Sequence, residues 1–440
     1  MMKRFLTAAL AVILTLSLAA CSDGNNAKLP SVSTGDTSVL GTDFQKAMNQ
    51  SSSEWFSQIC ETSEGYYFQY DMMVYYIDKD TGESTALCGK PDCAHTYSES
   101  DRSCNALINA RFLTYYNGKL YYSNADRVKE NGSYVDYGER LFSMNLDGTE
   151  HNAIQSMNLT VGGNTSMFVT EPMIHRGYIY FCYSGALYAV ALGDDIDNAV
   201  KIYGSEIIAD GSNFINTNEM YYELWADGDV VYFMAKNVKQ SNGTYKDTLF
   251  SYNPQTNKTE KVWEVPNKSE VGTWDTTGVS VSHWYVSNGY IYFFLCGNDI
   301  WYTELSTGKT NKLIDLDLDA GIAAFSSEYI AVINKEYSGF MSFTGESSVT
   351  GGDTLFVYNY AGKLVKEISL KDFYDDNENV TDCDLLWIGN GKVYIHVDAT
   401  TVGGVNVSTG ASTATVNRHS IITVDIESGA INKTGWNIGK

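Results

Sequence analysis

The amino-acid sequence predicts an all-β fold, a seven-bladed β-propeller of four-stranded antiparallel blades, with six or eight blades as the alternatives. A tight turn followed by a short aromatic strand recurs seven times along the chain, and a second hairpin with a different turn follows it. Five prolines and 32 tyrosines in 440 residues agree with a chain dominated by strands, because proline interrupts strand ladders and aromatic side chains pack well between sheets.

The first repeated element is a glycine turn that leads into an aromatic strand. Asn-Gly and Asp-Gly between two apolar runs are strong hairpin signals, because both turn residues adopt positive φ readily. Recurrence every 40 to 60 residues or so is typical of repeat architectures. The copies are Gly65–Phe68, Asn117–Tyr122, Gly177–Phe181, Asp227–Phe233, Asn288–Phe293, a degenerate Ser327–Val332, and Asn390–Ile395.

The second element is a hairpin with a polar turn, such as Tyr75–Gly82 or Leu141–Gly148, which precedes a final strand such as Thr259–Trp263. Each unit therefore consists of four strands joined by a tight turn, a variable connection and another tight turn. The third unit, Leu187–Ile202, fits least well because its turn at Gly193 is looser. A string of β-sandwich domains is the rival fold, and it would need linkers that the sequence lacks.

The N-terminal residues have the pattern of an export signal. Lys3 and Arg4 precede an apolar stretch, Phe5–Leu18, which is shorter than the roughly 20 residues of a spanning helix. Small residues then lead into Cys21, as in a bacterial lipobox. We expect a signal peptide over residues 1–20, diacylation of Cys21, a flexible tether over 21–50 and the propeller over 51–440. The protein would then lie on the extracytoplasmic face of the cell membrane, at the cell surface in a Gram-positive host.

The chain is strongly acidic, with 53 acidic against 30 basic side chains and a formal net charge of −23. This charge argues against nucleic acid as a partner, because phosphates would be repelled. It also keeps an exported domain soluble. We expect a monomer that contacts the membrane only through its N-terminal lipid.

Connection lengths predict which face of the disc binds a ligand. The first and third turns of each unit are tight, whereas the second connections and the crossovers between units are long, and these share one face. Loops on a rigid scaffold are frequent binding sites, although long loops also simply tolerate insertions. The aromatic side chains that this face could present are Tyr134, Tyr137, Tyr245, Trp274, Tyr337 and Phe340.

Cysteines cluster in the crossover after the first unit. Cys88, Cys93 and Cys104, together with His95, fall within seventeen residues. Such a set could form a tetrahedral Cys₃His zinc site, a disulfide, which is the usual state of paired cysteines outside the cell, or free thiols, and the spacing matches no common zinc knuckle. The remaining mature cysteines, Cys60, Cys182, Cys296 and Cys383, are isolated in the sequence, and we expect the middle two to be small core residues.

The lipobox, the segment Cys88–His95 with Cys104-Asn105-Ala106, and the Asn-Gly aromatic repeats together resemble surface lipoproteins of gut Firmicutes. These carry a propeller domain similar to that of low-density-lipoprotein-receptor-related proteins. The resemblance covers most of the chain after the tether, and its cysteine segment is the more specific part. It implies a surface lipoprotein and carries over no catalytic residue.

The sequence favours a non-catalytic module that binds a protein, a peptide or a glycan through the face with the long connections. No Gly-x-Ser-x-Gly nucleophile elbow is present, and neither is the Ser-x-Asp-x-Gly-x-x-Trp turn of sialidase-type propellers. The alternative is a cell-envelope polysaccharide hydrolase or lyase that uses paired carboxylates in the central channel. We assign no catalytic residue and expect no cofactor, apart from zinc as one alternative at the cysteine cluster.

Overall fold

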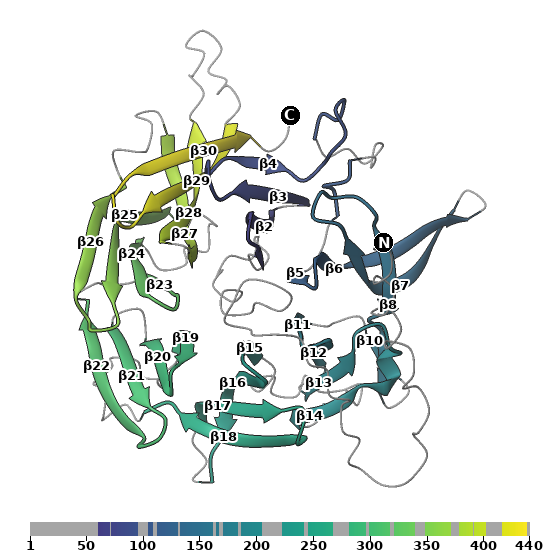
Figure 1. Cartoon of the computed structure of the whole chain (residues 1–440), viewed down its shortest axis with the longest axis horizontal. Coiled ribbons are helices and arrows are strands. Elements are labelled where there is room, and N and C mark those ends of the chain that lie inside the picture. The colour runs from purple at the N-terminus through teal and green to yellow at the C-terminus, as the bar shows by residue number, and fades with distance from the viewer. Residues whose placement is uncertain are drawn as a thin grey trace, which may run out of the picture.

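The chain forms a closed ring of seven four-stranded antiparallel sheets, as the repeats predict (Figure 1). This computed structural model describes residues 60–437. It leaves out 71, 96–103, 109–111, 131–132, 162–163, 167–169, 184–185, 205–221, 242–244, 267–280, 296–298, 317–320, 339–347, 371–377, 390 and 402–415. The predicted signal peptide, Cys21 and the tether lie outside the described residues, and so do the first residues of the predicted propeller.

Within each blade the strands pair in chain order from the channel outward. Blade 1 is β1 (Cys60–Glu61), β2 (Gly65–Tyr70), β3 (Met73–Asp78) and β4 (Ser84–Ala86). Blade 2 is β5 (Leu113–Tyr116), β6 (Lys119–Glu130), β7 (Ser133–Met144) and β8 (Asn152–Ser156). Blade 3 is β11 (Thr170–His175), β12 (Tyr178–Tyr183), β13 (Ala186–Ala191) and β14 (Val200–Gly204).

Blade 4 is β15 (Tyr222–Asp227), β16 (Val230–Lys239), β17 (Tyr245–Asn253) and β18 (Lys258–Glu264). Blade 5 is β19 (Val281–Ser287), β20 (Tyr290–Leu295), β21 (Asp299–Glu304) and β22 (Lys309–Asp315). Blade 6 is β23 (Gly321–Phe325), β24 (Tyr329–Ser338), β25 (Ser348–Asn359) and β26 (Leu364–Ser369). Blade 7 is β27 (Glu378–Gly389), β28 (Lys392–Thr401), β29 (Val416–Asp425) and β30 (Ile431–Asn437).

The tight first turns have the backbone that their sequences predict. In the turn between β5 and β6, Asn117 has φ 48° and Gly118 has φ 77°. The turn between β19 and β20 has similar angles, with φ 52° at Asn288 and φ 78° at Gly289. Two consecutive positive φ angles define the hairpin turn whose twist matches that of the strands. The sequence repeat therefore corresponds to the junction of the first and second strands of each blade.

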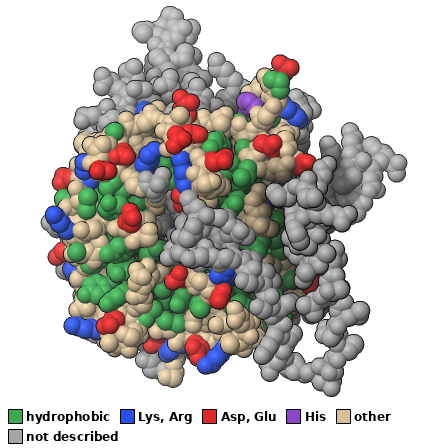
Figure 2. Space-filling view, in the orientation of Figure 1, with side chains coloured by type: hydrophobic (Ala, Val, Ile, Leu, Met, Phe, Trp, Pro, Cys, Tyr) green, Lys and Arg blue, Asp and Glu red, His purple; other side chains and the backbone are tan. Residues whose placement is uncertain are grey.

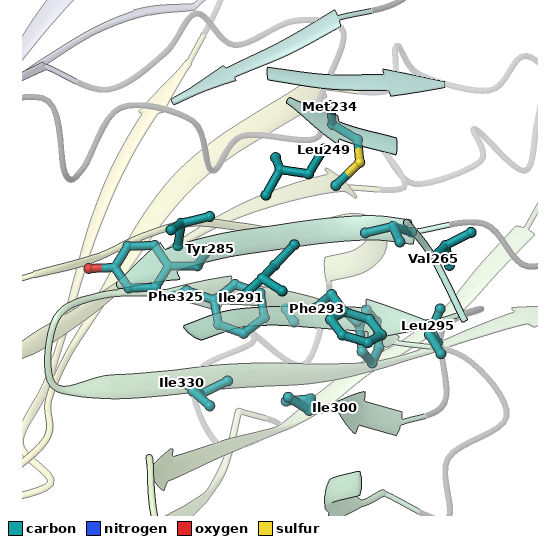
Figure 3. Close-up of a cluster of buried hydrophobic side chains, with 14 of the residues drawn as sticks. Met234, Leu249, Val265, Tyr285, Ile291, Phe293, Leu295, Ile300, Phe325 and Ile330 are labelled. Carbon is teal, nitrogen blue, oxygen red and sulfur yellow. The ribbon is translucent and has the colours of Figure 1, made fainter. Parts of the chain in front are cut away.

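The core lies between neighbouring blades, where the faces of adjacent sheets cover one another (Figure 3). Met234 and Leu249 of blade 4 belong to one buried cluster with Phe293 of blade 5 and with Phe325 and Ile330 of blade 6. Burial of apolar surface of this kind contributes about 25 cal/mol per Å². The tyrosine and phenylalanine stripes of the repeats are mostly this packing, as expected from the sequence.

The fourth strand of five blades carries the same bulge, one extra residue opposite two consecutive residues of the third strand. The register between third and fourth strands shifts between an aliphatic residue and the next, aromatic residue. Such bulges increase the local twist of a strand. The repeated bulge therefore increases the twist between the outermost strand and the inner strands of these five blades. The five pairs are Leu141/Phe142, Leu187/Tyr188, Leu249/Phe250, Ile300/Trp301 and Val357/Tyr358.

Among the described strands, none is shared between the first and last blades, since β1–β4 and β27–β30 form two separate four-stranded sheets. Side chains hold this seam instead. The rings of Tyr66 and Tyr394 meet edge to face with centroids 4.8 Å apart, and Lys392 Nζ donates to the Lys79 carbonyl at 2.8 Å. Gly82, with φ 72°, lies so close to Asn432 of β30 that a Cβ would be 3.3 Å from its amide nitrogen.

Three features differ from the sequence-based description. The long second connections, such as Asn124–Gly138, fold largely as extensions of the hairpins: β6 and β7 stay paired as far as Glu130 and Ser133. The loose turn of the third blade contains a short 3₁₀ helix, η1 (Ile196–Asn198). Residues between blades 2 and 3 add a small hairpin, β9 (Leu159–Val161) and β10 (Asn164–Ser166).

No helix in the described part of the chain is long and apolar enough to cross a membrane.

Candidate functional site

The face with the second connections is elaborated in four of the seven blades, and we call it the hairpin face. In blades 1, 3 and 5 the second and third strands have six residues each. In blades 2, 4, 6 and 7 these strands have 9 to 12 residues. At 3.3 Å per residue, the extra length carries a hairpin roughly 10 to 20 Å further. The hairpin of β6 and β7 reaches beyond the outline of the ring (Figure 1).

Only one of the six predicted aromatic residues is described as a side chain. Tyr245 begins β17 on the hairpin face and is 46% exposed, the largest exposure among the described large hydrophobic side chains. Tyr134 and Tyr137 lie in β7, and Tyr337 lies in β24, but their side chains are outside those described. Trp274 and Phe340 are outside the described residues altogether. Tyr245 is therefore the one predicted aromatic residue of this face whose exposed side chain is described.

The described side chains on one face of the ring carry charges of both signs. In the view of Figure 2, acidic and basic side chains are interspersed there, with apolar side chains between them. Several acids are paired locally with lysine, for example Asp299 with Lys312 at 2.8 Å. In this view the net charge of −23 does not concentrate at one place.

The cysteine cluster is brought together in the crossover that follows β4. The metal-binding atoms of Cys88, Cys93, His95 and Cys104 all lie within 4.8 Å of one another. The Cys104 sulfur is 3.8 Å from Nδ1 of His95. Cys104 is buried and the other three are half-buried. No disulfide joins Cys88, Cys93 and Cys104 in the structure, and the choice between disulfide, metal and thiol stays open at this point.

Backbone contacts fix both halves of this cluster on blade 1. Cys88 comes two residues after β4, and its neighbour Leu87 donates its N–H to the carbonyl of Val74 in β3. On the other side, the N–H of Val74 bonds the Ala106 carbonyl, and the N–H of Ile108 bonds the Met72 carbonyl. Met72 lies in the second connection of blade 1, so the cluster is on the hairpin face.

The two sulfurs at the ends of the cluster have different electrostatic surroundings. Burial acts to raise the pKa of Cys88, but hydrogen bonds from the backbone N–H groups of Lys90 and Asn105 outweigh it, and the pKa lies below its usual value. Burial raises the pKa of Cys104, although the N–H of Ala106 opposes the shift. Cys88 is therefore the thiol that loses its proton first.

The isolated cysteines differ in what the structure describes. Cys60, Cys182 and Cys383 are buried, and Cys182 lies in the apolar strand β12, as predicted for a core residue. Cys296 lies outside the described residues.

The enzyme alternative depends on paired carboxylates in the central channel. Glu61, at the end of the channel-side strand β1, is 7% exposed, and its carboxylate accepts from Lys79 Nζ at 2.6 Å. Burial raises the pKa of Glu61, and the charge of Lys79 partly opposes this shift. Asp227, at the end of β15, is half-buried. The side chains of Glu223, Asp382 and Asp384 on other channel-side strands are outside those described.

Blade 4 and blade 5 meet at a buried polar group that sequence reasoning missed. The Asp247 carboxylate accepts the N–H of Val281 at 3.1 Å and lies 3.6 Å from Lys236 Nζ, which donates to the Val281 carbonyl. His283 lies beside them, and burial together with the Lys236 charge lowers its pKa to about 4. Lys236 and Asp247 come from the paired strands β16 and β17, whereas Val281 and His283 come from β19 of the next blade, so no local motif marks the group.

Comparisons with known proteins assign no family to the chain. No protein-family model matches the chain, and no curated protein matches it. Among solved structures, a puromycin hydrolase is 11% identical, with a TM-score of 0.47, over 91% of this chain and 57% of the hydrolase. The dipeptidyl peptidase 4 of Porphyromonas gingivalis is 11% identical, with a TM-score of 0.40, over 90% of this chain and 53% of the peptidase.

A third similar structure is BamB from Moraxella catarrhalis, 11% identical with a TM-score of 0.37 over 87% of this chain and 94% of BamB. The chain spans little more than half the length of the hydrolase and the peptidase. All three TM-scores are below 0.5, so the assignment as a β-propeller rests on the ring of seven four-stranded sheets itself.

Proposed function

We propose that this propeller is a non-catalytic binding module, held on the outer face of the cytoplasmic membrane through a diacylated Cys21, whose hairpin face binds a protein, a peptide or a glycan. The observation that carries the proposal is the selective lengthening of the second hairpins in blades 2, 4, 6 and 7. Seven similar blades would fold with short hairpins alone, as blades 1, 3 and 5 do.

A rigid ring that carries several projecting hairpins on one side offers a broad surface with adaptable rims. Tyr245 supports this function, because it leaves nearly half of its surface exposed at a hairpin end. An exposed tyrosine binds through both its ring and its hydroxyl, and such side chains are enriched in binding hot spots. The net charge of −23 disfavours a polyanionic ligand.

An array of glycans and peptides, probed with the purified protein, tests the proposal. The informative variant is Tyr245→Ala on the hairpin face, and its matched control is Leu364→Ala, which removes a side chain that is 40% exposed next to the third turn of blade 6. We expect Tyr245→Ala to weaken binding of the array ligand about tenfold, which is about 1.4 kcal/mol, and Leu364→Ala to leave it unchanged.

Two results would count against this function. Weakening by Leu364→Ala with no change in Tyr245→Ala would move the binding surface to the opposite side of the disc. Turnover of a cell-envelope polysaccharide, with no array ligand bound, would favour the hydrolase or lyase alternative.

Membrane attachment is tested separately with Cys21→Ser. We expect the parent protein to fractionate with membranes and to carry the mass of a diacylated N-terminus, whereas Cys21→Ser is recovered as soluble protein. Retention of the variant in the membrane fraction would overturn the assignment of Cys21 as the anchor.

A further inference from the structure

We infer that Cys88, Cys93, His95 and Cys104 form a structural zinc site that fastens the first crossover to the ring. The first argument is the donor set itself. Three sulfurs and one imidazole nitrogen converge within 4.8 Å, and Cys₃His is a common ligand set for structural zinc. A disulfide would use only two of the three sulfurs and leave the third thiol beside the imidazole.

Distances between the donor atoms agree with tetrahedral coordination. Zinc lies about 2.3 Å from thiolate sulfur and about 2.0 Å from imidazole nitrogen, so tetrahedral donors are about 3.5 to 3.8 Å apart. Nδ1 of His95 is 3.8 Å from the Cys104 sulfur. The widest separation in the set, 4.8 Å, needs a contraction of about 1 Å, which rotation of half-exposed side chains provides.

Two of the cysteines share a backbone arrangement that suits thiolate ligands. The Cys88 sulfur accepts the N–H of Lys90, and the Cys104 sulfur accepts the N–H of Ala106. In both cases the donor lies two residues after the cysteine, and Cys88 also accepts the N–H of Asn105 from the opposite half of the cluster. Donors around the sulfur of this kind orient metal ligands and offset the charge of the thiolates. The two halves of the site are thus preformed as matching turns.

The position of the site explains what a metal would do there. Cys104 and Ala106 are buried in one apolar cluster with Tyr66 and Phe68 of blade 1, and with Tyr394 and Ile421 of blade 7. Cys88 and Cys93 pack against the same cluster. The site therefore lies beside the seam of the ring, where the described strands of the first and last blades belong to two separate sheets. Four protein ligands leave no open position, so the zinc is structural rather than catalytic.

Metal content and thiol state of the full-length protein test this assignment. The protein is purified without chelator, and its metal content is measured by inductively coupled plasma mass spectrometry. Free thiols are counted in denaturant before and after a chelator is added. We expect one zinc per chain, with Cys88, Cys93 and Cys104 reduced. Cobalt(II) exchanged into the site should give the thiolate-to-metal charge-transfer and intense visible bands of a tetrahedral centre.

The variants are Cys93→Ser and His95→Asn, chosen because both side chains are half-buried, with Cys182→Ala as the matched control in β12. We expect zinc to fall at least tenfold in the two ligand variants and to stay at one equivalent in the control. Circular dichroism verifies that each variant is folded.

Three outcomes would overturn the inference: a parent protein that binds no zinc even after reduction and reconstitution, a disulfide within the three cysteines shown by peptide mass analysis, or equal zinc in Cys93→Ser and the parent. One equivalent of iron in place of zinc, lost in the same variants, would overturn the identity of the metal.

Discussion

The buried ion pair of Glu61 and Lys79 at the seam allows a quantitative prediction. Both side chains are only 7% exposed, and Lys79 Nζ lies 2.6 Å from the Glu61 carboxylate. The same ammonium donates to the Thr62 carbonyl at 2.6 Å and lies 4.9 Å from the centre of the Tyr66 ring. Replacement of Lys79 by methionine therefore leaves a buried carboxylate without its positive partner.

We expect Lys79→Met to lower the free energy of unfolding by about 3 to 5 kcal/mol near pH 7.5, the usual cost of removing one partner of a buried ion pair. At roughly 2 °C per kcal/mol for a large domain, the melting temperature falls by about 6 to 10 °C. Lys258→Met is the control, because Lys258 pairs with Glu260 while 67% exposed, and we expect it to cost less than about 1 kcal/mol.

The pH dependence separates the charge from lost packing. Burial already raises the folded-state pKa of Glu61, and loss of Lys79 raises it further. A folded-state pKa above the unfolded value favours the protonated fold, so Lys79→Met should regain stability as the pH falls toward 5, by up to about 1.4 kcal/mol per unit. Unfolding in urea, followed by tryptophan fluorescence, measures this change.

The double variant Glu61→Gln/Lys79→Met should recover most of the lost stability, because no buried charge remains. A difference between Lys79→Met and the parent that stays constant from pH 8 to pH 5 would refute the electrostatic explanation. So would a double variant as unstable as Lys79→Met.

Two further predictions concern packing between blades and buried histidine. Gly148→Ala should destabilise the fold by about 2 kcal/mol more than Gly118→Ala. The two glycines have nearly equal φ angles, 75° and 77°, so the backbone strain of the substitution is matched. They differ in space, because a Cβ at Gly148 would lie 2.3 Å from the Leu87 carbonyl oxygen while one at Gly118 meets nothing within 4 Å. Equal melting temperatures would show that the blades shift apart freely. The folded-state pKa of His283 is lowered to about 4, whereas the unfolded value is near 6.5. The neutral histidine therefore stabilises the fold fully above pH 6.5, and this stabilisation is lost as the pH falls, by about 2 kcal/mol between pH 7 and pH 5. His283→Gln should lose correspondingly less over this interval in urea unfolding, and an unchanged pH slope would contradict the shift.

The sequence predicted the fold because its signals are local. Asn-Gly turns such as Asn117-Gly118 set a hairpin through positive φ angles, and a turn followed by an aromatic strand that recurs seven times leaves few architectures. The length of the hairpins was not predictable to the same degree. Strand continues through polar segments such as Asn124–Glu130, whose sequence shows no alternation of apolar residues that would mark a strand.

The sequence likewise predicted the candidate site whose residues are close together in the chain and missed those whose residues meet only in the folded structure. Cys88, Cys93 and His95 are close in sequence, so their proximity could be predicted, and Cys104 joins them. The pair of Glu61 and Lys79 could not be predicted, because seventeen residues and two strands separate the partners. Lys236, Asp247 and His283 were missed for the same reason, since their meeting depends on how blade 4 docks on blade 5.

The separation of the first and last sheets has a consequence for assembly of the protein. Every described sheet is contiguous in the chain, so each blade can be completed as soon as its own residues are available, and the contact of Tyr66 with Tyr394 comes last. For the same reason, a circularly permuted gene that is opened at any crossover would divide no sheet.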